Sequence, residues 1–466
     1  MKVQGDLGVK SGRILTPAGW FAGTVVVRDG RIAGLVPDGG DVSVAEAIDV
    51  GEKCVIPGLV DTHVHFRDPG FTEKEDFETG SRAAAAGGVT TVVDMPNVDP
   101  PTNTVEAFTK HIANASKKSL VDFGHNASGT IPENIAGLVA AGATNLKVFM
   151  MVDIGREYPH PPGTALTDHA TLFRVCEEVA KVGSTLLVHP HDQDLYALMV
   201  ERSQARWGLD FRSYARAWRA HDGVVIDSAI ATLLQLQRVT GVRLHILHVS
   251  TVEGWHLIGQ AKARGQAVTA EVNPHALFVA HPWENIERLG PYALGSWVPD
   301  DAAEATWRAV ADGGLADVIA TDHAPHTREQ KELGWTDMYA CPGGLPFIQE
   351  ALPLLLTEVN RGRLSLERLV DLYATNPAKL TGLFPKKGAI TPGADGDLVV
   401  LDLDKRAVVS AADRYYSKCG WTANEGRVVQ GVPVMTILRG QVIMKDGEVM
   451  GEPGYGQFQY RVAQDA

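Results

Sequence analysis

Residues 60–70, which read VDTHVHFRDPG, decide how the rest of the chain is interpreted. Their apolar residues predict a buried strand, in which residues two apart point to the same face. His63 and His65 therefore project together. Burying two imidazoles at the end of an apolar strand is costly unless their lone pairs find a partner. The stretch alone leaves two interpretations open: a metal site, or a pair of hydrogen-bonded core histidines.

Seven further apolar, β-branched runs follow, and most are separated by amphipathic helical segments. They begin at residues 89, 119, 143, 184, 242, 266 and 316. Eight strands alternating with helices predict an α/β protein with a (β/α)8 TIM-like barrel. A doubly wound open sheet is the alternative. It is disfavoured because no Gly-rich phosphate loop follows the first strand.

Both ends of the chain have a different pattern of short strands and Gly-containing turns. The Asp29-Gly30 pair between two alternating apolar runs predicts a β-hairpin. We therefore expect residues 1–57 and 386–466 to form one small β-sandwich domain with a C-terminal tail. Residues 58–385 would form the barrel.

Composition excludes several classes of protein. The net charge of −13 over 466 residues argues against general binding to nucleic acid or to an anionic membrane. Four cysteines far apart in sequence do not indicate a disulfide framework. Neither a signal peptide nor an apolar run of the ~20 residues that span a bilayer is evident, so a cytoplasmic location is expected.

Polar residues interrupt the ends of several predicted strands. A single histidine at such a position is usually a core residue whose hydrogen bonds are satisfied. A repeated pattern instead predicts a shared site, because the catalytic groups of barrels come from the C-terminal ends of the strands. The residues concerned are His63, His65, Lys147, His189, His248 and Asp322.

These residue types suit two divalent ions that activate a water molecule. Lys147 is unusual, because burial and nearby positive charge both favour a neutral amine. A neutral lysine can react with CO2 to give a carbamate, which offers two oxygens to a pair of metal ions. The alternative is a lysine whose stem packs along the barrel and whose amine reaches the surface.

With these residues in place, the chain resembles the cyclic amidohydrolases, which comprise the dihydroorotases, allantoinases and hydantoinases or dihydropyrimidinases. Residues 58–97 look most like a dihydroorotase. The motif TDHAPH at 321–326 is similar to dihydroorotases and allantoinases. The segments NPAKLTGL at 376–383 and KGAITPGADGDLVVLD at 387–402 resemble the part of these enzymes in which the chain leaves the barrel and re-enters the small domain.

The resemblance implies metal-dependent hydrolysis of a ring amide C–N bond in a cyclic amide or ureide. Two ions per chain, expected to be Zn(II), would be bridged by carboxylated Lys147. The first ion would also bind His63, His65 and Asp322, and the second His189 and His248. Asp322 would act as general acid and base as well. A homodimer or homotetramer is expected.

The resemblance also implies a set of substrate-binding residues, namely Arg67, Asn97, His275 and His326. A guanidinium suits a substrate carboxylate. For Arg67 a salt bridge to Glu75 or Asp68 is the alternative, and for His275 a loop-packing role.

The sequence departs from the dihydroorotase pattern in three places. Pro190, His191 and Asp192 replace a small residue and a glutamate, and the segment at 273–276 has lost one histidine. The substrate loop at 294–299 reads LGSWVP, which suggests a more apolar pocket.

Other interpretations also remain open. A mononuclear deaminase of the same superfamily or a non-catalytic scaffold relative are the rival functions. The aromatic residues Trp207, Tyr214 and Trp218 would form an interface, a lid or ordinary helix packing.

Overall fold

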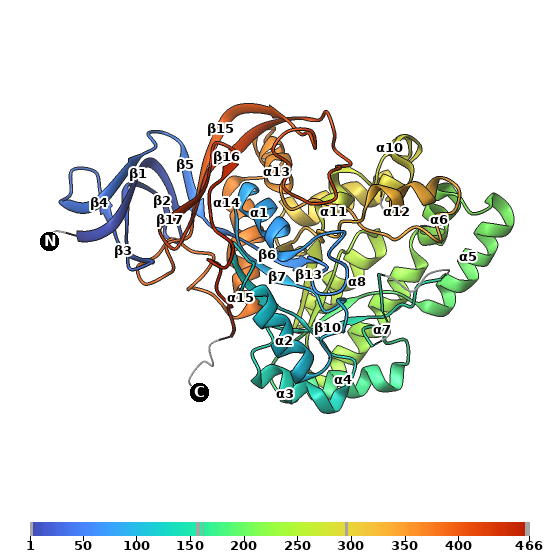
Figure 1. Ribbon diagram of the computed structural model, residues 1–466. Coiled ribbons are helices and arrows are strands. Elements are labelled where there is room, and N and C mark those ends of the chain that lie inside the picture. Colours follow the sequence, from blue (N-terminus) through green and yellow to red (C-terminus); the bar gives the residue numbers. More distant parts are fainter. Residues whose placement is uncertain (1–2, 155–158, 162, 294–296, 462–466) are drawn as a thin grey trace.

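A computed structural model describes residues 3–154, 159–161, 163–293 and 297–461. Strands from both ends of the chain form one β-rich part, and the middle of the chain forms a larger part with helices packed around parallel strands (Figure 1).

The larger part contains the eight strand positions that the apolar runs predict. They form two parallel sheets, in the orders β6-β7-β8 and β9-β10-β11-β12-β13-β14. Their bounds are β6 Leu59–Val64, β7 Val89–Asp94, β8 Asp122–His125, β9 Ala127–Ser128, β10 Leu146–Phe149, β11 Thr185–His189, β12 Arg243–Ile246, β13 Val268–Val272 and β14 Val318–Ile319.

The two sheets continue into one another. Only Asn126 separates β8 from β9, so these two short strands occupy one barrel position. On the other side, the N–H of His65 donates to the C=O of His323 just beyond β14 (2.8 Å). The (β/α)8 prediction is confirmed, and the C-terminal ends of all these strands face one rim.

Helices follow most of these strands and cover the barrel. Asp76, Thr104, Asp168, Asp192 and Thr251 cap helices with side-chain oxygens, as the chemistry of helix N-termini requires. The helices are α1 Phe77–Ala86, α2 Val105–Ala115, α3 Ile135–Ala140, α4 His169–Lys181, α5 Gln193–Trp207, α6 Phe211–Trp218, α7 Val224–Thr240, α8 Val252–Ala263, α9 Pro274–Phe278, α10 Trp283–Leu289, α11 Asp300–Ala311, α12 Arg328–Glu332, α13 Ala351–Asn360, α14 Leu366–Val370 and α15 Asn376–Thr381.

The smaller part is a nine-stranded sheet to which both ends of the chain contribute. Its order is β18-β17-β16-β15-β5-β1-β2-β3, and β4 pairs with β1. Its strands are β1 Val3–Thr16, β2 Gly19–Arg28, β3 Arg31–Pro37, β4 Val42–Asp49, β5 Cys54–Pro57, β15 Leu398–Val408, β16 Val428–Leu438, β17 Gln441–Lys445 and β18 Glu448–Val449. The predicted hairpin is present, with Arg28 opposite Arg31.

The central pairing joins β5 to β15, so segments far apart in sequence are neighbours in this sheet. A separate apolar core, which includes Val9, Val25, Ile32, Leu398 and Ile437, fills the small domain. The division at residues 57/58 and 385/386 remains our proposal for the domain boundaries. Within the described ranges, no helix combines the length and apolar character that a membrane span requires.

A buried lysine joins the two parts. Lys387 Nζ lies 2.5 Å from Asp122 Oδ2 of the barrel, 2.9 Å from Asp395 Oδ2 and 2.7 Å from Asp397 Oδ2. Arg439 of the small domain also pairs with Asp122. Although burial by itself lowers the pKa of Lys387, the carboxylates around it raise that pKa above its usual value. Lys387 is therefore protonated where it lies among these three carboxylates.

A buried acid at the start of α13 makes folding sensitive to pH. Both carboxylate oxygens of Glu350 accept from Thr422 Oγ1 (2.8 and 2.7 Å), and Oε1 also accepts from Asn424 Nδ2 (2.8 Å). Burial raises the pKa of Glu350 to about 7, against the lowering effect of these hydrogen bonds. The folded state therefore holds a proton that the unfolded chain releases at lower pH.

We expect Glu350→Gln to flatten the pH dependence of stability. Protonated Glu350 contributes to the stability of the folded state. This contribution is fully present below the pKa of the unfolded chain, near 4.5, and is lost as pH rises through the pKa of the folded state, about 7. The variant keeps an amide that donates and accepts, so its free energy of unfolding relative to that of the wild type should rise by about 2 kcal/mol between pH 5.5 and pH 8.5. Urea unfolding at pH 5.5 and 8.5 measures this. The exposed Glu448→Gln is the control, and parallel profiles for Glu350→Gln and wild type would contradict the prediction.

Candidate metal centre

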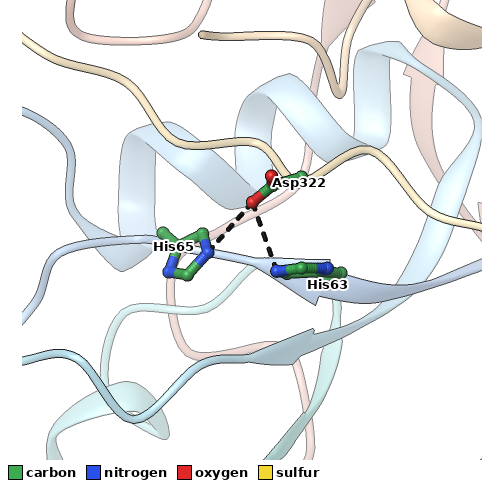
Figure 2. A group of neighbouring side chains, drawn as sticks. All are labelled: His63, His65 and Asp322. Carbon is green, nitrogen blue, oxygen red and sulfur yellow. Dashed lines mark hydrogen bonds and ion pairs between the residues drawn. The ribbon is translucent and has the colours of Figure 1, made fainter. Parts of the chain in front are cut away.

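The first barrel strand and the end of the last strand bring three predicted ligands together. His63 projects from β6, His65 follows the end of that strand, and Asp322 follows β14 (Figure 2). Asp322 Oδ1 lies 3.2 Å from His63 Nε2 and 3.1 Å from His65 Nε2. These three atoms form a group that can hold a metal ion.

Hydrogen bonds on the far side of each ring orient the two imidazoles. Glu271 Oε1 on β13 accepts from His63 Nδ1 (2.8 Å), and Asn97 Oδ1 accepts from His65 Nδ1 (2.6 Å). With Nδ1 protonated, each Nε2 presents a lone pair towards Asp322. Two lone pairs and a carboxylate oxygen that face one another repel, and a cation between them would relieve this repulsion. Such outer partners are a regular feature of metal-bound histidine.

Burial keeps three of the predicted histidine ligands neutral. It lowers the pKa of His65 and of His248 to about 3, and it lowers that of His189 well below its usual value. Although burial alone raises the pKa of Asp322, the nearby histidines hold it well below its usual range. The set therefore offers neutral nitrogens and an ionised oxygen, which are the donors that Zn²⁺ takes.

The other predicted ligands lie on neighbouring strands. Lys147 is on β10, His189 ends β11, and His248 follows β12. The rings of His189 and His248 have centroids 4.4 Å apart, and the His248 ring lies 6.0 Å from that of His63. Five of the six predicted ligands line one cavity: His63, His65, His189, His248 and Asp322.

Lys147 is fully buried, and its Nζ lies 4.2 Å from the centroid of the Phe149 ring. Within the described part of the chain, Nζ has no hydrogen-bond partner. Burial lowers the pKa of Lys147 to about 7, although the charges of Asp322 and Glu271 act in the opposite direction. The alternative of an amine that reaches the surface is wrong, because the whole side chain is enclosed. The amine is instead available in its neutral, nucleophilic form.

The backbone is strained at three positions of this site. Arg67, His248 and Asp322 have φ values of +63°, +40° and +49°, a region that side-chain-bearing residues seldom adopt. Residues held in this way cost on the order of 1 kcal/mol or more each and concentrate at functional sites. Asp61 helps to hold the backbone conformation at Asp322, because its carboxylate accepts from the N–H (3.1 Å) and hydroxyl (2.6 Å) of the preceding residue, Thr321.

The cavity above these groups has a volume of about 130 Å³. Its lining combines apolar and aromatic side chains with polar ones. The apolar lining residues are Phe149, Met151, Tyr214, Trp218, Ile226 and Val298, and the polar ones include Arg67, Asn97, His160, Arg219, Ser250 and His275.

The predicted substrate-binding residues occupy different positions. Arg67, Asn97 and His275 line the cavity. Asn97 also uses both of its polar atoms within the protein, since Nδ2 donates to the C=O of Pro159 (3.0 Å). His326 lies behind Arg67, with Nε2 3.3 Å from Arg67 Nη2 and 2.8 Å from the C=O of Gly343.

The two acids offered as alternative partners of Arg67 bind other groups. Asp68 pairs with Lys118 (2.7 Å), and Glu75 lies 3.2 Å from His323 Nε2.

Several residues of the site escaped sequence analysis. Glu271 was visible only as an acid inside a predicted strand. The pair Asp153 and His160, joined at 3.0 Å, had no sequence signal beyond its residue types. Tyr214 and Trp218 on α6 line the cavity, whereas Trp207 is 40% exposed.

The three departures from the dihydroorotase pattern also have structural positions. His191 is buried behind the cavity wall, with ring centroids 4.6 Å from Tyr196 and 4.9 Å from Trp218. In the segment at 273–276, Asn273 Nδ2 donates to Glu271 Oε1 (3.1 Å). Residues 294–296 of the altered loop lie outside the described residues. The remainder contacts the site, because Arg219 Nε donates to the C=O of Trp297 and Val298 lines the cavity.

Comparison with known proteins gives a consistent result. Residues 54–443 match the amidohydrolase family. The chain is 36% identical over 463 residues to an L-hydantoinase of Paenarthrobacter aurescens, with 97% of each chain covered. It is 37% identical over 440 residues to a dihydroorotase of Halobacterium salinarum, covering 91% of this chain and 96% of the relative.

Solved structures agree over the whole fold. An L-hydantoinase (dihydropyrimidinase) from Arthrobacter aurescens superimposes with a TM-score of 0.91 at 35% identity, covering 98% of this chain and 100% of the other. A D-hydantoinase superimposes with a TM-score of 0.88 at 29% identity, covering 97% and 98%.

Proposed function

Since this chain belongs to the amidohydrolase family and is a hydrolase of cyclic amides, we propose that it opens its substrate ring with two zinc ions bridged by carboxylated Lys147. The observation that carries the proposal is that five of the six predicted ligands line one cavity, while the buried Nζ of Lys147 lies 4.2 Å from the ring of Phe149, which lines the same cavity. The first ion would bind His63, His65 and Asp322, and the second His189 and His248. The rival deaminase and scaffold interpretations lose support, because the relatives are named for ring hydrolysis.

The residues present fit this metal pair. Lys147 Nζ and His189 Nε2 are buried and have no hydrogen-bond partner among the described residues. A neutral amine at Lys147 would attack CO2, form an N–C bond and release one proton, which leaves a carbamate with two oxygens. When bound, the ions would polarise the ring carbonyl and increase the acidity of the attacking water.

Asp322 is the proposed general acid and base. Its Oδ1 faces both first-strand histidines, which leaves Oδ2 for proton transfer. The carboxylate would take a proton from the attacking water and give it to the ring nitrogen as the C–N bond breaks. The products would be a carboxylate and an amine, amide or urea nitrogen on one opened chain.

We further propose a hydantoin-type ring with an apolar or aromatic substituent as the substrate. The support is that Phe149, Tyr214 and Trp218 line the cavity, because aromatic lining favours an apolar group over a charged one. The high coverage of an L-hydantoinase agrees with this choice.

A second candidate substrate is a ring that carries a carboxylate, as in dihydroorotate. A specific observation favours it: the guanidinium of Arg67 lies in the cavity and is only 1% exposed. A buried guanidinium suits a planar carboxylate.

Ring opening by the zinc-loaded protein distinguishes the two substrates. We expect loss of amide absorbance with 5-aryl hydantoins, weaker turnover of hydantoin and dihydrouracil, and little with dihydroorotate. Arg67→Gln should then change kcat/KM for the aryl substrate by less than about tenfold. If dihydroorotate is the best substrate and Arg67→Gln lowers its kcat/KM at least about 100-fold, the carboxylate candidate is correct. Absence of turnover of every ring by protein with two zinc ions at the catalytic rim would contradict the proposed function.

A homodimer or homotetramer and a cytoplasmic location stay predictions. Analytical ultracentrifugation would test the first.

A further inference from the structure

A second group of histidines and a carboxylate lies in the barrel wall, apart from the proposed catalytic ligands. Asp94 ends β7, His125 ends β8, and His111 lies on α2, the helix that connects these two strands. Asp94 and His125 are register partners in the parallel pair β7–β8. All three side chains are buried, with exposures of 0%, 0% and 2%.

The distances within this group are too long for hydrogen bonds and suit a shared ion. Asp94 Oδ2 lies 3.5 Å from His111 Nε2 and 3.6 Å from His125 Nδ1. Ligands bound at 2.0–2.1 Å to a tetrahedral zinc ion are separated by about 3.3 Å. The corresponding distances between Asp322 and the two histidines of the catalytic group are 3.2 and 3.1 Å.

Hydrogen bonds to residues outside the group orient Asp94 and His125 so that one polar atom of each faces the other members of the group. Asp94 Oδ1 accepts from the N–H of Phe66 (2.8 Å), which leaves Oδ2 facing the histidines. His125 Nε2 lies 2.8 Å from Thr102 Oγ1, which leaves Nδ1 facing Asp94.

In the described part of the chain, Asp94 Oδ2, His125 Nδ1 and both nitrogens of His111 have no hydrogen-bond partner. Leaving buried polar atoms unsatisfied is costly, and one cation would satisfy three of them.

The surroundings keep the group in a metal-binding state. Phe77 and Phe108 cover it, with ring centroids 5.5 Å from His111 and 5.7 Å from His125. Burial lowers the pKa of His111 well below its usual value and that of His125 to about 3. Burial raises the pKa of Asp94 to about 6, while His111 and Arg67 act against this effect. At neutral pH the group therefore offers two neutral nitrogens and one ionised oxygen.

We propose that Asp94, His111 and His125 bind a third divalent ion, of the zinc class, with a structural function. It would tie α2 to β7 and β8. Through the Asp94–Phe66 hydrogen bond it would also hold the backbone next to His65 in place. This site shares no residue with the proposed catalytic pair, so the two proposals stand or fall separately.

Zinc content measures the proposal directly. After refolding with zinc and removal of excess metal, the wild type should hold one zinc ion more per chain than His111→Leu. Phe108→Leu changes packing on the same helix without removing a ligand, so it should keep the wild-type content. Equal zinc content in wild type and His111→Leu would overturn the proposal.

A second measurement does not depend on whether a variant folds. Anomalous scattering from wild-type crystals at the zinc edge should show a peak between Asp94, His111 and His125, besides any peaks at the catalytic rim. Absence of that peak from crystals grown with zinc would overturn the proposal, whatever the catalytic rim contains.

Discussion

Lys147→Met is expected to fold and to lose nearly all turnover, with a decrease in kcat of at least about 10³-fold. Methionine fills the same buried space with an unbranched side chain, so the packing beside Phe149 is kept. It cannot form a carbamate, and the two ions would lose their common ligand. Metal ions supply several kcal/mol of transition-state stabilisation, and each 1.36 kcal/mol corresponds to about tenfold in rate.

Three measurements check this expectation. Zinc at the catalytic rim should fall below two ions per chain in Lys147→Met, while the circular dichroism spectrum stays that of the wild type. Wild-type protein loaded with ¹³C-bicarbonate should show a carbamate carbon resonance that the variant lacks. Lys181→Met, at an exposed lysine on α4, is the control and should behave as wild type. Wild-type turnover by Lys147→Met would refute the bridging role.

Lys387→Met is expected to cause the largest loss of stability, about 3–5 kcal/mol. The variant leaves three buried carboxylates, from Asp122, Asp395 and Asp397, without their shared ammonium. Buried ion pairs as a whole add little net stability, but removal of one partner leaves uncompensated charge in a medium of low dielectric constant.

The neighbouring lysine provides a matched control. The Lys386 side chain is 39% exposed, and its Nζ lies 3.7 Å from Asp395 Oδ2. Exposed ion pairs contribute ~0–1 kcal/mol, so Lys386→Met should change the free energy of unfolding by less than about 1 kcal/mol. Urea unfolding of both variants at pH 7 compares them. Equal losses of unfolding free energy in the two variants would show that burial of the ion pairs of Lys387 does not cause the destabilisation. If Lys387→Met does not accumulate as folded protein, the triple change Lys387→Met, Asp395→Asn, Asp397→Asn should restore folding.

The parts of the fold and site that follow from local pattern were predictable. The apolar runs are regular enough to give all eight barrel positions, and the Asp29-Gly30 turn gives the hairpin. Proposed ligands such as His189 and Asp322 could be predicted because a polar residue at the end of an apolar run is recognisable in the sequence alone.

Other features depend on contacts between distant segments. Glu271 orients His63 across 208 residues of sequence, and nothing near either residue indicates the contact. Tyr214 and Trp218 line the cavity from α6, one of three helices, α5, α6 and α7, between β11 and β12, and the packing of these helices decides which side chains face the cavity. His111 was not predicted as a ligand, because a helical histidine has no strand end to mark it.

The pairing of β5 with β15 has a consequence for how the protein is made. Residues 58–397 separate these adjacent strands. At ~5–20 residues per second, a ribosome needs roughly 20–70 s to add that intervening chain. During this interval β1 and β5 are already synthesised but lack β15 as a neighbour. An unpaired strand edge of this kind can recruit another chain, so the nascent protein should depend most on chaperones before its last seventy residues emerge.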